Sequence, residues 1–418
     1  MNEEAALRRI LHANPERGFC EFRTTSLLVA RLRDLGAEVA LGADIMVPEL
    51  RMGVPEDVDR AWQEARDEGL DPETMAALRH GMTGVVATLR GRRPGRVVAV
   101  RADIDALPLT ESGSDGHRPY RLGFASTRPG TMHACGHDGH AAIALGLARR
   151  LADRDFAGTV KLLFQPAEEG LRGGRAVAAS GLLDDVDDLV CIHLGLGVPT
   201  GTVHPRTHGA LASVKLRATF TGVAAHAGLA PERGRSALLA AAAGALAVHA
   251  VGQHGSAATR VNVGALDCPG AANVVPASAT LSLEVRADDT AACDLLAERV
   301  VAALRGSAAA YGVACELATV GHAPQVRCDR DLADRIADVA AAVPAVTHVG
   351  GSLEDRGSDD AAWLLDRVRA HGGRGTYLVI GADQAGGHHE STFDIDEHAL
   401  TVGVDLLDRV VRTLGAAC

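Results

Sequence analysis

Aromatic residues and lysine are scarce in this sequence of 418 residues. Phe, Tyr and Trp make up 3% of the chain, so Ala, Val and Leu must supply most of the core packing. Lys161 and Lys215 are the only lysines, and arginine carries nearly all the positive charge, a composition typical of codon bias in a GC-rich genome. The formal net charge is −11, whereas phosphate binding requires a basic surface. We therefore expect no nucleic-acid partner.

The sequence also lacks the features of an export signal and of a membrane-spanning segment. Residues 1–4 include two acids where a signal peptide would be basic, and no apolar block follows them. The most apolar stretch, 237–251, is shorter than the roughly 20 residues of a membrane helix, and it predicts a buried helix. Eight cysteines occur without a CxxC pair, which argues against a disulfide framework. We expect a cytoplasmic protein without a membrane partner, in which Cys135 is available as a thiolate ligand.

Short apolar runs alternate with helix patterns in the first half of the chain. The runs 96–104, 159–164 and 188–193 are nearly continuous, which is typical of strands buried on both faces of an α/β sheet. Each is followed directly by polar, potentially reactive residues. Ligand sites in such folds lie beyond the carboxyl ends of the strands, so these residues are candidates for a functional site.

The pattern changes near Thr207. Apolar residues alternate with polar ones in 214–220 and again in 281–285, which indicates a sheet with one face in water. Helix patterns cover 236–251 and 290–311. Two strand-and-helix halves of this kind predict a small α+β domain.

The buried-strand pattern resumes at 376–380, so the small domain interrupts the first one. We predict a discontinuous catalytic domain at 1–207 and 322–418, and an inserted domain at 208–321. Residues 44–82 form a further polar, helix-forming insertion to which the sequence assigns no role.

Cys135 and His137 lie two residues apart in a loop that precedes a helix pattern. A thiolate and an imidazole are good ligands for borderline divalent metals such as zinc, and imidazole also accepts manganese. Asp103 or Asp138 could orient such a ligand through a hydrogen bond. Taken alone, the pair fits a buried thiol beside surface histidines better than it fits a metal site.

Two adjacent carboxylates, Glu168 and Glu169, follow the second strand pattern. Metal-dependent hydrolysis needs one carboxylate to bind the ion and another group to take the proton of the attacking water. Neighbouring residues in an irregular segment point in different directions, so these two could divide the tasks. The alternative is a solvated acidic turn.

Histidines follow two further strand patterns. His193 ends the third run, and His388 and His389 follow the run that ends at Ile380. A lone histidine is usually structural, but four elements at strand ends all carry ligands of the metal-binding type. Together they favour a metal site.

A thiol hydrolase is the main chemical alternative, with Cys135 activated by His137 or His140. Such an enzyme has no need of the paired glutamates or of His193. The sequence contains no Gly-x-Ser-x-Gly elbow, phosphate-binding loop or dinucleotide fingerprint.

These residues resemble the M20 metallopeptidase family over nearly the whole chain. The similar branch contains amidohydrolases that act on indole-acetyl-amino acids, hippurate and aminobenzoyl-glutamate. The motifs that carry the resemblance are Arg101–Pro108 (RADIDALP), the Cys135, Glu168–Glu169 and His193 segments, Asn273–Pro276 (NVVP) and Phe393–Glu397 (FDIDE). It implies an α/β zinc-peptidase-like catalytic domain with a mixed sheet, interrupted by a smaller α+β dimerisation (lid) domain.

The resemblance also implies two divalent metal ions per subunit, zinc or manganese. Cys135 would bridge them, and the other ligands would be His137, Glu169, His193 and His389. The family ligand lies four residues before the aromatic Phe393, which favours His389 over His388. Glu168 would be the general base that later protonates the leaving amine, and Asp105 would orient a ligand.

Three residues of the inserted domain match family positions that contact substrate. His226 resembles the histidine that polarises the scissile carbonyl in the site of a second protomer. Asn273 and Arg286 resemble residues that hold the substrate, and the planar fork of Arg286 suits a carboxylate. The alternatives are that His226 caps a turn and that Arg286 forms a surface ion pair.

The resemblance implies hydrolysis of the amide bond of N-acyl amino acids, including p-aminobenzoyl-glutamate or a related aroyl conjugate. The 44–82 insertion, with Arg51-Met52-Gly53, points to the aminobenzoyl-glutamate hydrolases within the family. We therefore expect a small-molecule substrate and a homodimer through the lid. Two alternatives are a hetero-oligomer with a homologous chain and an amidase recruited to biosynthesis. The early motif is reduced to Arg8–Glu16 (RRILHANPE), which leaves the acyl group open.

Overall fold

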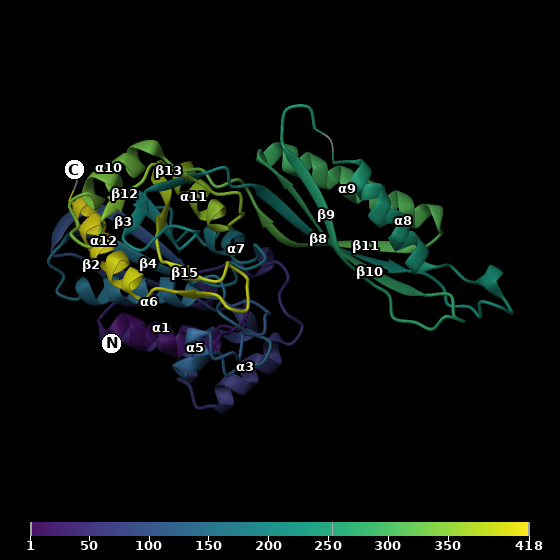
Figure 1. Ribbon diagram of the computed structural model, residues 1–418, viewed down its shortest axis with the longest axis horizontal. Helices are drawn as coiled ribbons and strands as arrows, with labels where there is room; N and C mark the ends of the chain where they lie inside the picture. The colour runs from purple at the N-terminus through teal and green to yellow at the C-terminus, as the bar shows by residue number, and fades with distance from the viewer. Residues whose placement is uncertain (1, 253, 417–418) are drawn as a thin grey trace. The chain divides into compact units, whose positions relative to one another are not determined.

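The computed structural model describes residues 2–252 and 254–416. The chain forms two compact units, one of Met1–Gly209 with Val326–Cys418 and the other of Ala210–Gln325 (Figure 1). The domain boundaries predicted from the sequence lie within a few residues of the ends of the second unit. The assignment of the two units as separate domains stays a prediction.

The first unit is built on an eight-stranded mixed sheet, in the order β1-β2-β4-β3-β5-β14-β6-β12. Its strands are β1 Glu38–Ala40, β2 Val85–Arg90, β3 Arg93–Asp103, β4 Ala157–Gln165, β5 Asp188–Leu194, β6 Thr202–His204, β12 His348–Val349 and β14 Arg374–Ile380. Strands β4, β3, β5 and β14 are neighbours and run parallel. Antiparallel pairing of β2 with β4 and of β6 with β14 makes the sheet mixed. The four parallel strands are those predicted from the apolar runs, and their carboxyl ends meet at one edge.

Helices and short ribbons complete the first unit. The helices are α1 Glu3–Ala13, α2 Phe22–Asp34, α3 Val58–Asp67, α4 Pro72–Ala77, α5 Arg118–Arg121, α6 His137–Arg150, α7 Gly174–Ala178, α10 Arg330–Ala340, α11 Ala361–Ala370 and α12 His398–Gly415. Two ribbons pair β7 Arg206–His208 with β13 Ser352–Glu354, and β15 Gln384–Ala385 with β16 Asp394–Ile395. The insertion at 44–82 thus contains α3 and α4.

The large core lies on one face of the eight-stranded sheet. Alternate residues of β3, such as Val98 and Val100, are fully buried there against side chains of α1, α6, α10 and α12. The residues between them point to the opposite face, where α7 and α11 pack. Because both faces are covered, the central strands are mostly apolar, as the sequence predicts, with charged residues such as Arg101 and Lys161 as exceptions.

Arg8 joins the amino-terminal helix to two other parts of the chain. Its guanidinium is fully buried and lies 2.8 Å from a carboxylate oxygen of both Asp138, in α6, and Asp394. A third carboxylate, Glu397, lies 3.5 Å away. Without this cation Asp138 would keep only His12 as a partner, while Arg118 and Arg9 would still pair with Asp394 and Glu397.

We expect Arg8→Ala to lower the free energy of unfolding by about 3–5 kcal/mol, the usual cost of breaking a buried ion pair from one side. Urea titration of the metal-free protein measures the change. The control is Arg60→Ala, whose guanidinium is exposed beside Asp57 and should contribute less than about 1 kcal/mol. Equal effects of the two substitutions would contradict this account of Arg8.

The second unit is a four-stranded antiparallel sheet, in the order β11-β8-β10-β9, with two helices. Its elements are β8 Ala212–Thr221, α8 Ala237–Ala250, β9 Thr259–Asp267, β10 Ser278–Ala287, α9 Thr290–Ala310 and β11 Ala314–Ala323. Both helices contact the sheet and share a core with it. Ser236 and Asp289 begin the helices by accepting hydrogen bonds from the third N–H that follows each.

The helix predicted to be buried is not fully buried. In α8, Leu246 is 79% exposed and Leu239 is 54% exposed. Apart from His249, the helix contains no residue that can carry a charge. The sheet and α9 nevertheless cover only part of its surface. The sequence shows that α8 is apolar all round, but burial depends on what packs against each side. None of the helices in the described ranges is long and apolar enough to cross a membrane.

Candidate metal centre

The Cys135 loop lies next to the carboxyl ends of the parallel strands. Gly136 has a φ of +90°, a left-handed conformation that glycine adopts readily, and α6 begins directly after it. This turn separates Cys135 from His137. His137 donates from Nδ1 to the backbone oxygen of Asp105 over 2.8 Å, so its Nε2 is left to face the glutamates.

Asp105 holds the glutamate loop in place. Its two carboxylate oxygens accept hydrogen bonds from the backbone N–H groups of Glu168 and Glu169, each over 3.0 Å. One of these oxygens also lies 3.4 Å from Nδ1 of His137. Asp105 therefore contacts the backbone of both glutamates and the ring of a predicted ligand.

The five predicted ligands converge on one small volume. The Cys135 Sγ lies 3.6 Å from His193 Nε2, and His389 Nε2 lies 3.5 Å from Glu169 Oε1. His137 Nε2 lies 4.0 Å from the same Glu169 oxygen. The donor atoms form overlapping triplets within 4.8 Å: Cys135–Glu169–His389, His137–Glu168–Glu169 and Cys135–His193–His388.

The chemistry of this donor set fits divalent metal ions. One thiol, several imidazoles and a carboxylate match the ligands of borderline metals such as zinc. In addition, His137 Nε2 and Glu169 Oε1 are buried without a hydrogen-bond partner among the described residues. Buried polar atoms are rarely left in that state, so a metal ion is the expected partner.

Adjacent histidines differ in their surroundings. Burial lowers the pKa of His388 to about 3, and its Nε2 accepts a hydrogen bond from the N–H of Leu196 over 3.1 Å. The neighbouring Cys135 thiol and Glu169 carboxylate raise the pKa of His389 to about 10. His388 nevertheless belongs to one donor triplet, so both histidines border the site.

Glu168 is buried in a negatively charged environment. Burial raises its pKa well above the usual value for glutamate, and the carboxylates of Asp359 and Glu169 raise it further. A general base works best when its pKa lies near the operating pH, so this environment suits the role predicted from the sequence.

Sequence reasoning missed a buried ion-pair network behind the site. Arg101 lies 2.7 Å from Asp103 and 3.1 Å from Asp359, and the Tyr377 hydroxyl donates to Asp359 over 2.6 Å. Asp103 in turn accepts a short hydrogen bond from His140. Arg101 and Asp103 belong to a family motif, but nothing local links them to Asp359, which lies 258 residues from Arg101.

The two candidate orienting aspartates have different partners. Asp103 lies 3.6 Å from His137 Nε2 and pairs with His140, whose Nε2 accepts from the N–H of Leu194. Asp138 instead pairs with Arg8 and His12. The hydrogen bonds of Asp103 thus lie within the site, whereas those of Asp138 join α6 to α1.

In the second unit, His226 and Asn273 are neighbours, whereas Arg286 lies apart from both. The N–H of Ala227 donates to the backbone oxygen of Asn273 over 2.9 Å. His226 is exposed, and its Nδ1 accepts hydrogen bonds from two following N–H groups, which leaves the ring hydrogen on Nε2. Arg286 pairs with Glu284 near the opposite end of β10. Within one chain, His226 caps a turn and Arg286 forms an ion pair.

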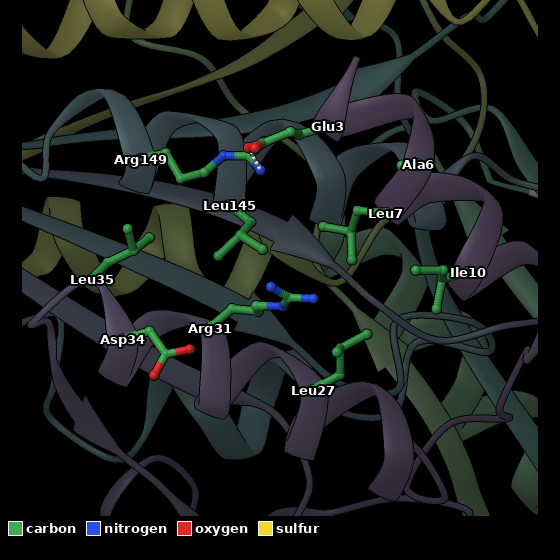
Figure 2. A pocket seen from close by; sticks show the side chains of 10 residues that line it. All are labelled: Glu3, Ala6, Leu7, Ile10, Leu27, Arg31, Asp34, Leu35, Leu145 and Arg149. Carbon is green, nitrogen blue, oxygen red and sulfur yellow. Dashed lines mark hydrogen bonds and ion pairs between the residues drawn. The ribbon is translucent and has the colours of Figure 1, made fainter. Parts of the chain in front are cut away.

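A separate cavity of about 400 Å³ opens between α1, α2 and α6. Leu7, Leu27, Leu145 and Arg31 point into it, and Glu3 bonds to Arg149 at its rim (Figure 2). None of the predicted site residues lines it. We therefore locate the chemistry at the donor cluster.

A cluster of sulfur, nitrogen and carboxylate donors, mostly buried but exposed at His389, lies at the carboxyl edge of a mixed α/β sheet and is typical of a metal-dependent hydrolase. Residues 99–413 match the model of peptidase family M20/M25/M40, and the chain belongs to this family. It is an amidohydrolase of the M20 metallopeptidase type.

Two curated relatives are each 44% identical to the chain. One is the indole-3-acetyl-aspartic acid hydrolase of Enterobacter agglomerans, and the other is named as one of the subunits of the p-aminobenzoyl-glutamate hydrolase of Escherichia coli. Each match covers 96% of this chain and 93% of the relative. The solved structure of the aminobenzoyl-glutamate utilization protein from Klebsiella pneumoniae is 38% identical, with a TM-score of 0.83 over 98% of this chain and 95% of that one. These similarities confirm the predicted family and fold class.

Proposed function

We propose that the chain hydrolyses the amide bond between an aromatic acyl group and an acidic amino acid. The observation that carries the proposal is that Glu168 adjoins the cluster of the five predicted ligands, which provides a base beside a place for metal ions. The acyl and amino-acid parts are suggested by the two relatives at 44% identity, whose names each combine an aromatic acid with aspartate or glutamate.

Cys135, His137, Glu169, His193 and His389 would hold two divalent ions, zinc or manganese. When bound, such ions polarise a carbonyl and lower the pKa of a coordinated water. Glu168 takes the proton of the attacking water and then delivers it to the nitrogen of the leaving amino acid. Asp105 positions this base through the N–H of Glu168, and Asp103 positions His140 beside the cluster.

A second copy of the chain, or a homologous partner, is needed to complete the substrate site. β10 begins at Ser278, which pairs with Thr221 at the end of β8, and the chain runs on from Thr221 to His226. Arg286 lies eight residues further along β10. At about 3.3 Å per residue this separation is about 26 Å, longer than an acyl amino acid. His226 and Asn273 from one copy and Arg286 from another would therefore act on the same substrate.

The exposed apolar side of α8 supports a homodimer through the second unit. Leu239 and Leu246 lie on a helix without Asp, Glu, Lys or Arg, which is unusual for a surface in permanent contact with water. A second copy of the same helix would bury both.

We expect Leu246→Arg to convert a dimer into a monomer and to lower activity at least about tenfold, because it places a charge in an apolar interface and separates His226 from its target site. Size-exclusion chromatography with light scattering measures the mass. Leu122→Arg, at a half-exposed leucine of the first unit, is the matched control. An active Leu246→Arg monomer would contradict the two-copy site.

The proposed function is tested by loading the purified chain with manganese or zinc and assaying a panel of acyl amino acids. We expect release of glutamate or aspartate from aroyl and indolyl-acetyl conjugates, and much slower release from aliphatic acyl conjugates. Activity only after addition of a homologous partner chain would favour the hetero-oligomer, to which the Escherichia coli relative points because its name describes one component of an enzyme. Hydrolysis of none of these amides by any loaded form would refute the proposal.

A further inference from the structure

The insertion at 44–82 packs against the loop that carries Glu168 and Glu169. The N–H of Val47 donates to the backbone oxygen of Ala176 over 3.0 Å, and the N–H of Met52 donates to that of Arg172 over 3.3 Å. The insertion therefore forms part of the surroundings of the glutamate loop, although the sequence assigns it no role.

Arg172 connects the insertion to the metal site. Its Nε donates to the backbone oxygen of Glu169 over 2.7 Å, and its Nη1 donates to that of Gly53, in the insertion, over 3.2 Å. No carboxylate among the described residues forms an ion pair with it. Two carbonyl contacts leave part of the guanidinium available to bind an anion.

Arg51 of the insertion is a half-buried cation that forms no ion pair, and the carboxylate of Glu49 acts on it only at longer range. Its guanidinium donates to the backbone oxygens of Pro48 and His80, and it too lacks an ion pair with any described carboxylate. Burial lowers the pKa of Arg51. Half-buried charges normally have a partner of opposite sign, so this one is suited to receive an anion.

Both arginines lie over the same buried ring. The guanidinium carbons of Arg51 and Arg172 lie 5.7 Å and 5.8 Å from the centre of the Phe19 ring, and Phe19 is fully buried. The two positive charges therefore share one aromatic contact, and Arg172 lies directly beside Glu169. Two arginines can bind one carboxylate through several charge-assisted hydrogen bonds.

Backbone strain is concentrated in the same region. Outside glycine, seven described residues have a positive φ, and four of them, Phe19, His80, Ala167 and Leu171, belong to this cluster or to the adjoining loop. Leu196 and His389, two of the remaining three, border the metal site. Non-glycine residues held in this conformation collect at functional sites, so the strain separately points to function here.

We propose that Arg51 and Arg172 bind the side-chain carboxylate of the amino acid released by the metal site, and so select glutamate or aspartate conjugates over neutral ones. The inference rests on the proposed function, because it assumes that an acyl amino acid is cleaved. It assigns the insertion to recognition of the amino acid, whereas Arg286 of the second unit remains the candidate for the α-carboxylate.

The test compares two substrates that share an acyl group, p-aminobenzoyl-glutamate and p-aminobenzoyl-glutamine, in the metal-loaded full-length protein. The wild type should prefer the glutamate conjugate. Arg51→Met should lower kcat/KM for that conjugate by roughly ten- to a hundredfold, mainly through KM, and change the glutamine conjugate by less than about threefold. Arg51→Lys should keep much of the preference, since it keeps the charge.

Arg79→Met is the matched control, because Arg79 comes from the same insertion, stacks on Trp62 and also lacks an ion pair with a described carboxylate. It should leave the glutamate-to-glutamine ratio unchanged. Arg51→Gln is a second neutral variant that can still donate to a backbone carbonyl, should the methionine variant fold poorly.

The outcomes separate this inference from the proposed function. Equal losses on both substrates, or no loss on either, would overturn the carboxylate subsite while the amidase function stands. A wild type that cleaves both conjugates equally well would do the same. If the loaded wild type cleaves no acyl amino acid at all, the proposed function fails and the subsite assignment fails with it.

Discussion

Glu168→Gln is expected to lose at least about a thousandfold in kcat while it keeps its metal. The substitution preserves the shape of the side chain but removes the group that accepts a proton, and positioned acid–base groups contribute roughly 10²–10⁴-fold. Turnover of p-aminobenzoyl-glutamate and metal content by mass spectrometry are measured on the same preparation.

Glu169→Gln is the informative companion because it alters the neighbouring carboxylate. Glu169 belongs to two donor triplets and contacts both His137 and His389. We expect this variant to lose metal as well as activity and to recover partly in excess metal, whereas Glu168→Gln should not recover. A metal-loaded Glu168→Gln protein with a tenth of wild-type turnover would exclude Glu168 as the general base.

The stability of the metal-free Glu168→Gln protein provides a further control. The pKa of Glu168 is raised in the folded chain, so this group opposes folding at neutral pH, and the penalty decreases as the pH falls through the folded-state pKa and is gone below the unfolded-state pKa. Replacing the carboxylate by an amide removes the penalty. We therefore expect the variant to be at least as stable as the wild type at pH 7, so that lost activity cannot come from unfolding.

Removal of metal by a chelator is expected to abolish activity, and added manganese or zinc should restore it. The same treatment should lower Tm, because ions that bind only the folded state stabilise it by mass action. His137 Nε2 and Glu169 Oε1 would again lack a partner in the metal-free protein. Activity and Tm are followed during stepwise readdition of each metal, with magnesium as a control ion that prefers oxygen ligands.

The chelator experiment also decides the role of Cys135. Burial raises the pKa of the Cys135 thiol, so in metal-free protein at neutral pH it stays protonated and is a poor nucleophile. A bound ion would instead stabilise the thiolate as a ligand. Full turnover by demetallated protein would revive the thiol mechanism.

Much of the site could be predicted because the pattern that identifies a buried parallel strand also fixes where the strand ends. Asp105, Glu168 and His193 all follow or end strands whose apolar runs are plain in the sequence. Since neighbouring parallel strands bring their carboxyl ends together, residues far apart in the chain could be grouped before their contacts were known. The family resemblance then assigned each one a role.

Local patterns did not reveal the contacts that depend on packing between distant segments. The pairing of Arg101 with Asp359 requires β3 and the start of α11 to meet behind the sheet. The contact of Arg51 with the Phe19 ring, which Arg172 also contacts, requires the insertion to fold back onto the glutamate loop. The sequence around Arg101 and the sequence around Arg51 do not indicate these partners.

The sequence by itself determined the fold class, the family and the metal-dependent class of the chemistry, and it predicted an inserted second unit and a set of ligand residues. Periodicity and motif spacing are properties of residues close together in the sequence, so they can be recognised without a structure. Only the tertiary structure decided that α8 keeps an apolar side exposed, that His226 and Arg286 lie near opposite ends of β10, and that Arg51 and Arg172 contact the same Phe19 ring. Those facts depend on which surfaces pack together and on the register of the strands. Packing and register fix side-chain burial and the distances between residues, and neither follows from the order of residues in the chain.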